Sequence, residues 1–174
     1  IKNVCDSIYN SKTNKIAEGI ILIYSAYIDS GILPMALALE EMGFTQYNKK
    51  AKTLLKSPPS PVDVTTMQPP TDKKKFKPAR YVIITGDPRI SPDNDGDVKA
   101  ITNDDNIFEL DKNGKKIDIS GEKIKVVLIS QAGSEGLDFK AIRQIHILEP
   151  WYNMNRNEQI IGRGVRNFSH KDLP

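Results

Sequence analysis

Four apolar-rich stretches constrain the fold of this chain more than any other feature. They occupy residues 20–24, 81–84, 124–129 and 142–148, and Ile and Val dominate them. The first two are unbroken, whereas Lys125 interrupts the third and three polar residues interrupt the fourth. A strand with one solvated face alternates apolar and polar residues, whereas an unbroken run indicates a strand covered on both faces, as in a parallel sheet. Parallel neighbours need long crossover connections, which are usually helical. The sequence therefore predicts an α/β domain, a largely parallel sheet with helices on both faces.

Shorter signals predict the elements around these strands. Residues 1–10 carry apolar side chains at the spacing of one helical face, and a second helix is expected between the first strand and Gly43. Asp29 and Ser30 offer N-cap oxygens for that second helix, and Gly43 is a typical helix stop. Asn113-Gly114 predicts a hairpin turn between two short strands.

Residues 91–106 are acidic and rich in turn formers, so we expect an irregular segment there. The run from Asp93 to Gly96 resembles part of a calcium loop. With Gly96 at the sixth loop position, however, Ser91 and Thr102 fall where carboxylates belong, which argues against calcium. No metal site is expected in this chain.

The length of 174 residues suits one domain, residues 1–174. Within it, residues 57–78 are rich in Pro, Ser and Thr, and they predict a surface insertion that is partly disordered. The basic run at 73–75 could touch phosphate, but its composition favours a solvated loop.

Bulk composition excludes several classes of protein. The net charge of +3 is too small to indicate a polyanion binder by itself, so any nucleic-acid site must rest on local features. The single cysteine, Cys5, excludes an internal disulfide and fits the cytosol or nucleus. No apolar run reaches the roughly 20 residues that span a bilayer, so no membrane partner is expected. The chain starts without Met, as an excised fragment would.

Two loops that follow strands carry the candidate chemistry. Ligands of parallel sheets collect at the carboxyl ends of strands. In residues 130–139, Gly133 and Gly136 allow close backbone approach, Ser130 offers a hydroxyl to phosphate, and Asp138 suits a ribose hydroxyl.

The second loop leads into a helix expected from about residue 155. Its Arg163 and Arg166 lie three positions apart, so both guanidinium groups would leave one helix face and converge on one polyphosphate. Two glycines, Gly162 and Gly164, each cost about 1 kcal/mol in a helix relative to alanine, which favours a functional reason for them over a structural one.

These patterns resemble a known family. Gln159-x-x-Gly162-Arg163-x-x-Arg166 is similar to motif VI of superfamily 2 helicases, and residues 130–139 are similar to motif V. Residues 20–25 resemble motif IV, and Gly86 lies in a turn that resembles the one after the next strand of that lobe. Residues 145–153, with 159–166 and 169–170, are similar to helicase-like transcription ATPases of large cytoplasmic DNA viruses.

The resemblance implies a RecA-like second motor lobe and a role for each matched residue. Arg166 would be the main arginine finger on the γ-phosphate, and Arg163 and Gln159 would assist it. Other matched positions would bind the nucleotide (Glu135, Gly136, Asp138 and Gly162) or contact the nucleic-acid backbone (Ser25, Gly86 and Ser130).

Other parts of a motor are missing from the sequence. It has no phosphate loop and no acidic pair for Mg²⁺, so the resemblance implies that ATP and Mg²⁺ are held chiefly by a first lobe and that this fragment alone is inactive. The expected partners are that lobe, a DNA or RNA strand, and viral RNA polymerase or transcription factors, in the virion and host cytoplasm. The alternative is a non-catalytic docking module of a viral transcription complex.

Overall fold

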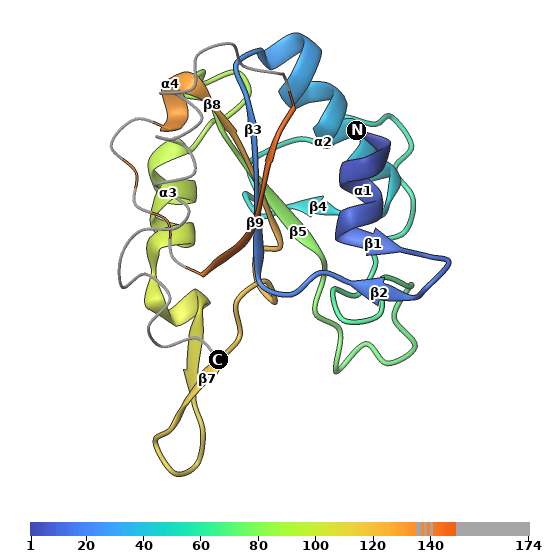
Figure 1. Cartoon of the computed structure of the whole chain (residues 1–174), viewed down its shortest axis with the longest axis vertical. Helices are drawn as coiled ribbons and strands as arrows, with labels where there is room; N and C mark the ends of the chain where they lie inside the picture. The colour runs from blue at the N-terminus through green and yellow to red at the C-terminus, as the bar shows by residue number, and fades with distance from the viewer. Residues whose placement is uncertain (135–136, 138, 140, 149–174) are drawn as a thin grey trace.

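The computed structural model describes residues 1–134, 137, 139 and 141–148 (Figure 1). Its centre is a five-stranded sheet of order β4-β5-β8-β3-β9 in which every neighbouring pair is parallel. The four predicted strands are confirmed, and the sheet gains a short edge strand, β4, that the sequence analysis missed. The strands are β3 (Ile20–Ser25), β4 (Thr45–Gln46), β5 (Arg80–Ile84), β8 (Val126–Ser130) and β9 (Ile142–Ile147).

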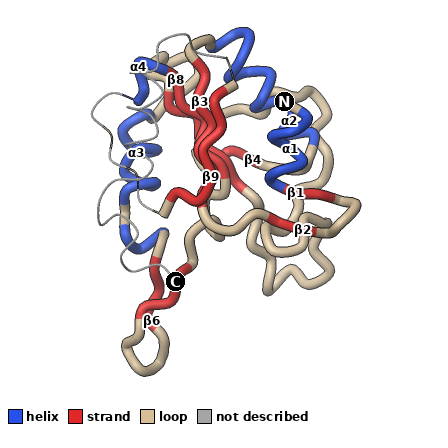
Figure 2. Tube along the Cα trace, viewed as in Figure 1, coloured by secondary structure: helices blue, strands red, loops and turns tan. Residues whose placement is uncertain are grey.

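Helices cover both faces of this sheet, as predicted (Figures 1 and 2). Helices α1 (Lys2–Ile8) and α2 (Leu33–Glu41) lie on one side, and α3 (Asn94–Thr102) lies on the other. Side chains along β3 alternate between the two cores: Ile21 and Ile23 pack with the α2 side, whereas Leu22 and Tyr24 pack with the α3 side. Because both faces are buried, the strand reads as an unbroken apolar run.

The connection from β3 to α2 differs from the expected capped helix start. A π-helical turn (Ile28–Ile32) precedes α2, and no side chain caps either segment. The predicted caps at Asp29 and Ser30 are therefore wrong, because the chain enters α2 already in a helical conformation. Gly43 is confirmed as the stop: it follows the C-cap residue Met42 at φ +96°, a conformation that glycine adopts without strain.

Residues 91–106 are more ordered than the sequence analysis expected, because they contain α3 and a 3₁₀ turn (Asp104–Asn106). The Asp93 carboxylate caps α3 by accepting a hydrogen bond from the Gly96 amide. Poor helix formers hid this helix, and burial of Ala100 and Ile101 against the sheet compensates for their low propensity.

Two small hairpins lie outside the main sheet. The predicted turn at Gly114 (φ +75°) is confirmed between β6 (Phe108–Leu110) and β7 (Lys116–Asp118), which project away from the domain (Figure 1). The other pairs β1 (Tyr9–Asn10) with β2 (Lys15–Ile16). In the part of the chain that the structure describes, no helix is long and apolar enough to cross a membrane.

The Pro-rich segment at 57–78 has no regular secondary structure, but it is anchored to the domain. Val62, Val64 and Met67 are buried in the core on the α2 side. The Asp63 carboxylate accepts hydrogen bonds from the Thr65 and Lys77 amides, at 2.8 and 3.0 Å. These contacts hold the two arms of the segment together.

Candidate functional site

Small polar residues stand at the carboxyl ends of three adjacent strands. Ser25 ends β3, Ser130 ends β8, and Thr85 directly follows β5. Ser25 and Ser130 are register partners, and all three residues are at least 97% buried. This carboxyl edge lies at the top of Figure 1, where α2 and α4 (Gln131–Ser134) are also found.

The hydroxyl groups of this edge are bonded to nearby backbone. Ser130 Oγ donates to the Thr85 carbonyl at 3.2 Å and accepts from the Gly133 amide at 3.3 Å. Ser25 Oγ donates to the Tyr27 carbonyl at 2.9 Å and accepts from the Tyr27 amide at 3.1 Å. The two serines therefore shape the turns after β3 and β8, and a ligand at this edge would meet the turns before it met these hydroxyls.

Gly133 brings α4 against the end of β5. A Cβ at this position would collide with the Ile84 carbonyl oxygen. The close approach thus requires glycine, as the sequence analysis expected of this loop, although here the close neighbour is a strand of the same sheet. It fixes where the loop at 130–139 begins.

The turn after β5 is bonded to the Ser91 hydroxyl, and its Gly86 is exposed to solvent. Ser91 Oγ donates to the Ile83 carbonyl at 2.7 Å and accepts from the Thr85 amide at 3.1 Å. Gly86 follows at φ +75°, is exposed, and has no other atom within 4 Å of its missing Cβ. The Gly86 amide donates to Asn94 Oδ1 at 3.4 Å, so a phosphate that bound this amide would replace Asn94.

A basic cavity of about 320 Å³ lies beside this turn, and the sequence analysis missed it. Lys50, Lys52 and Arg89 contribute to its lining, together with Ile83 of β5. Arg89 makes an ion pair with Asp87 at 2.8 Å, and this guanidinium lowers the pKa of the Asp87 carboxyl. The three lysines at 49–52 were the available signal, but the sequence analysis named only the uninterrupted run at 73–75 as a phosphate contact.

Asp97 is a buried carboxyl group near the same edge. It lies on α3 and is only 4% exposed. Burial raises its pKa from 3.8 to about 6; a hydrogen bond from Asn48 opposes this rise and the charge of Asp93 adds to it. The Asn48 side-chain nitrogen has no partner of good geometry, so we regard that bond as weak and burial as the dominant cause.

Ser25, Gly86 and Ser130 are the predicted site residues that the structure describes, and it brings them to one edge. The others lie outside the described residues: Glu135, Gly136, Asp138, Gln159, Gly162, Arg163 and Arg166. The helix expected from about residue 155 lies outside them too. Among the side chains that the structure describes, no group of three His, Cys, Asp or Glu could hold a metal ion.

Comparison with known proteins gives matches of two kinds. Residues 97–168 match the family model of the helicase conserved C-terminal domain. A termination factor NPH-I homolog of African swine fever virus is 30% identical over 94% of this chain and 23% of its own length. Nucleoside triphosphatase I of Amsacta moorei entomopoxvirus is 53% identical over 32% of this chain and 8% of its own length. No solved structure matches.

Proposed function

We propose that this chain is the second motor lobe of an ATP-dependent nucleic-acid helicase or translocase in viral transcription. The match of residues 97–168 to the helicase conserved C-terminal domain and the similarity to viral relatives support this proposal. The RecA-like fold agrees with this family. The chain spans less than a quarter of the length of either relative, 23% and 8%. The activity, substrates and partners of a whole enzyme are therefore part of the proposal.

One observation carries the proposal: three neighbouring strands, β8, β3 and β9, end at a single edge of the sheet. Ser25 and Ser130 end β3 and β8 side by side. The Leu148 amide donates to the Tyr24 carbonyl at 3.0 Å, so β9 ends at this edge too. Strands β3, β8 and β9 therefore all end where ligands of parallel sheets bind.

The proposed catalytic groups belong to the segment after β9. Arg166, assisted by Arg163 and Gln159, would neutralise charge that develops on the γ-phosphate in the transition state. Gly136, Asp138, Glu135 and Gly162 would contact the nucleotide. An arginine finger is worth about 10³- to 10⁵-fold in rate in related phosphoryl-transfer enzymes.

The nucleic-acid strand would pass over the turn at Gly86 and the basic cavity beside it. Backbone amides, lysines and arginines bind phosphates without reading sequence, which suits a protein that moves along a strand. Arg89, Lys50 and Lys52 supply the cations for such contacts.

We assign Mg²⁺ no ligand among the described residues, because they offer no suitable cluster. A first RecA-like lobe would hold the metal and most of the phosphate contacts. When bound there, Mg²⁺ would neutralise phosphate charge, while this lobe supplies cations from the opposite side of the cleft. The viral relatives suggest that the protein acts in the virion and host cytoplasm.

The test is nucleic-acid-stimulated ATP hydrolysis by a protein that contains both lobes. We expect Arg166→Ala to lower kcat at least 10²-fold, and Arg166→Lys to rescue little because lysine lacks the forked guanidinium. The control is Lys112→Ala, which removes an exposed cation from the loop between β6 and β7. Turnover within twofold of the native protein after Arg166→Ala would instead support the non-catalytic docking module.

A further inference from the structure

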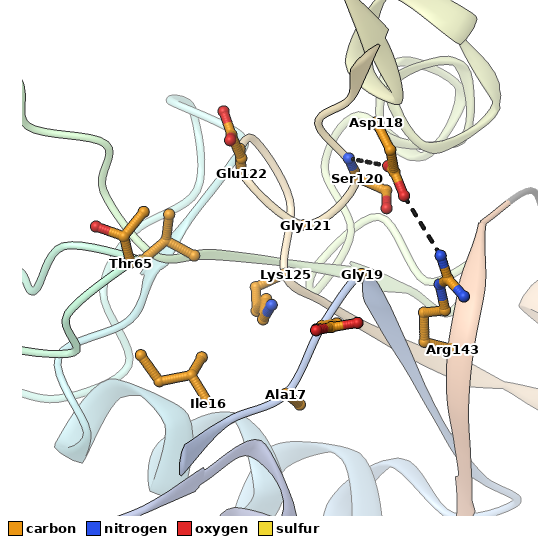
Figure 3. A pocket seen from close by; sticks show the side chains of 12 residues that line it. Ile16, Ala17, Gly19, Thr65, Asp118, Ser120, Gly121, Glu122, Lys125 and Arg143 are labelled. Carbon is orange, nitrogen blue, oxygen red and sulfur yellow. Dashed lines mark hydrogen bonds and ion pairs between the residues drawn. The ribbon is translucent and has the colours of Figure 1, made fainter. Parts of the chain in front are cut away.

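A second cavity lies at the amino edge of the sheet, opposite the candidate site. It has a volume of about 410 Å³. Gly19 precedes β3, Lys125 precedes β8, and Arg143 lies near the start of β9; the loop with Ser120 and Gly121 completes one wall (Figure 3). The motor function proposed above uses none of these residues.

Lys125 is a buried cation without a bonded partner in this cavity. The residue is 5% exposed, and its ammonium group has no hydrogen bond or ion pair with any residue that the structure describes. The other cations nearby have partners: Arg143 pairs with Asp118 at 3.5 Å and Lys77 with Glu122 at 2.7 Å. Burying an unpaired charge is costly, so an unbonded lysine at such a position calls for a ligand.

A second unbonded donor lies in the wall of the same cavity. Ser120 Oγ is buried and has no hydrogen-bond partner among the described residues. Its own amide donates to Asp118 at 2.8 Å, which fixes the loop that carries the hydroxyl. Buried hydroxyls are rarely left unpaired in folded proteins. Lys125 and Ser120 both line this cavity, and neither side-chain donor has a hydrogen-bond partner among the described residues.

Two glycines allow close packing in the wall of the cavity. A Cβ on Gly19 would collide with the Arg143 side chain, and a Cβ on Gly121 would collide with the Gly19 carbonyl. Both have positive φ, +64° and +85°. The two backbone segments consequently pack directly on each other in the cavity wall that includes Lys125 (Figure 3).

Lys125 keeps its charge at neutral pH despite its burial. Burial lowers the pKa of Lys125 to about 8, and the charges of Glu18 and Glu122 partly oppose that shift. At pH 7 the ammonium form therefore still predominates. Those carboxylates and Asp118 also give the cavity an acidic rim, which repels ligands of high negative charge.

We propose that this cavity binds a small molecule through a single oxyanion group, a carboxylate or a phosphate, held by the Lys125 ammonium and the Ser120 hydroxyl. The cavity volume of about 410 Å³ suits a small-molecule ligand. Nucleoside triphosphates are excluded by the acidic rim. The site is therefore separate from the ATP site of the motor.

The test is an NMR titration of the ¹⁵N-labelled full chain with sodium acetate or inorganic phosphate, at constant ionic strength set with chloride. We expect saturable shifts of the Gly19, Ser120 and Gly121 amides for at least one of the two anions. Saturation by acetate alone assigns carboxylates, and saturation by phosphate alone assigns phosphates. Shifts that stay linear for both anions would overturn the proposal, and so would saturation of these amides by ATP.

Variants separate this site from general charge effects. Lys125→Met keeps an unbranched apolar stem, and it should weaken binding on the order of tenfold or more, since a charge-assisted hydrogen bond is lost. Lys123→Met removes an exposed cation two residues away and should leave the affinity unchanged. Ser120→Ala gives an independent check with a smaller, severalfold loss. Equal affinities of Lys125→Met, Ser120→Ala and the native chain would contradict the assignment.

Discussion

Ser25 and Ser130 are register partners at the ends of two adjacent parallel strands, and the hydroxyl of each contacts backbone beyond its own strand. The turns after β3 and β8 consequently begin at the same level of the sheet. A difference of one residue in either strand would place one turn about 3.3 Å behind the other. The paired ends therefore align the loop at 130–139 with the turn that leads to α2.

Ser130→Ala should destabilise the chain by about 1–2 kcal/mol, because it removes a donor to the Thr85 carbonyl and an acceptor for the Gly133 amide in a buried site. Urea denaturation followed by circular dichroism measures the change. Ser7→Ala is the matched control, since its hydroxyl donates to Asn3 at an exposed position. Equal losses of unfolding free energy in Ser130→Ala and Ser7→Ala would mean that the Ser130 hydrogen bonds do not stabilise the loop.

Gly133→Ala and Gly114→Ala separate a steric requirement for glycine from a conformational one. Gly133 has no room for a Cβ beside Ile84, so its substitution must displace α4 and should cost about 2–3 kcal/mol. Gly114 has open space but a φ of +75°, so its substitution should cost about 1 kcal/mol. Thermal unfolding of both variants tests the order, and a larger loss for Gly114→Ala would contradict it.

The sequence predicted the sheet well because burial on both faces leaves an unmistakable pattern. Strands β3 and β8 are apolar up to the serine that ends each, and every position in both is buried. Strand β9 carries Arg143, Gln144 and His146 and is only partly buried, so its pattern was weaker. The strand β4 was missed because its two residues, Thr45 and Gln46, form a sheet edge whose pairing partner, β5, begins only at Arg80, far ahead in the chain. Local pattern carries no information on such a pairing.

Other features depend on tertiary packing in the same way. Helix α3 is stabilised by contacts of Ala100 and Ile101 with the sheet, which outweigh its poor helix formers. The sequence indicated that Ser25, Gly86 and Ser130 lie near one edge, through their resemblance to helicase motifs. It gave no sign of the unbonded Lys125, because a lysine before an apolar strand looks like an ordinary exposed residue.

Asp97→Asn should stabilise the chain at pH 7 by about 1 kcal/mol. Burial raises the pKa of Asp97 from 3.8 to about 6, so the folded state holds this proton more tightly than the unfolded state. The native chain therefore loses stability from this group as the pH rises from about 4 to about 6. The advantage of the Asp97→Asn variant over the native chain should be full above that window and vanish below it, which urea denaturation at about pH 4 and pH 7 can measure.

Asp95→Asn is the control for this pH dependence, because Asp95 is exposed in the same first turn of α3. Both substitutions remove a favourable interaction of a carboxylate with the helix dipole. The difference in unfolding free energy between the two variants therefore reports the cost of burying the Asp97 carboxylate. A gain at pH 7 that Asp95→Asn shares, or one that persists at pH 4, would rule out the buried carboxyl as its cause.

The salt dependence of nucleic-acid binding tests whether the basic cavity contacts phosphate, as the proposed motor function requires. In a protein with both lobes, Arg89→Gln should weaken binding and reduce the slope of log K against log salt by about one, the loss of one phosphate contact. Asp87→Asn should strengthen binding, because Asp87 holds Arg89 in an ion pair at 2.8 Å and competes with phosphate for it.

Opposite effects of these two neighbouring substitutions would be hard to explain by damage to the fold, since both side chains lie beside the exposed turn at Gly86. Lys112→Gln removes a charge from the β6–β7 loop, far along the chain, and should leave the slope unchanged. If Arg89→Gln and Lys112→Gln gave the same slope, the strand would have to follow another path across the carboxyl edge. The arginine-finger prediction for Arg166 would be unaffected, because ATP and nucleic acid would meet different residues of that edge.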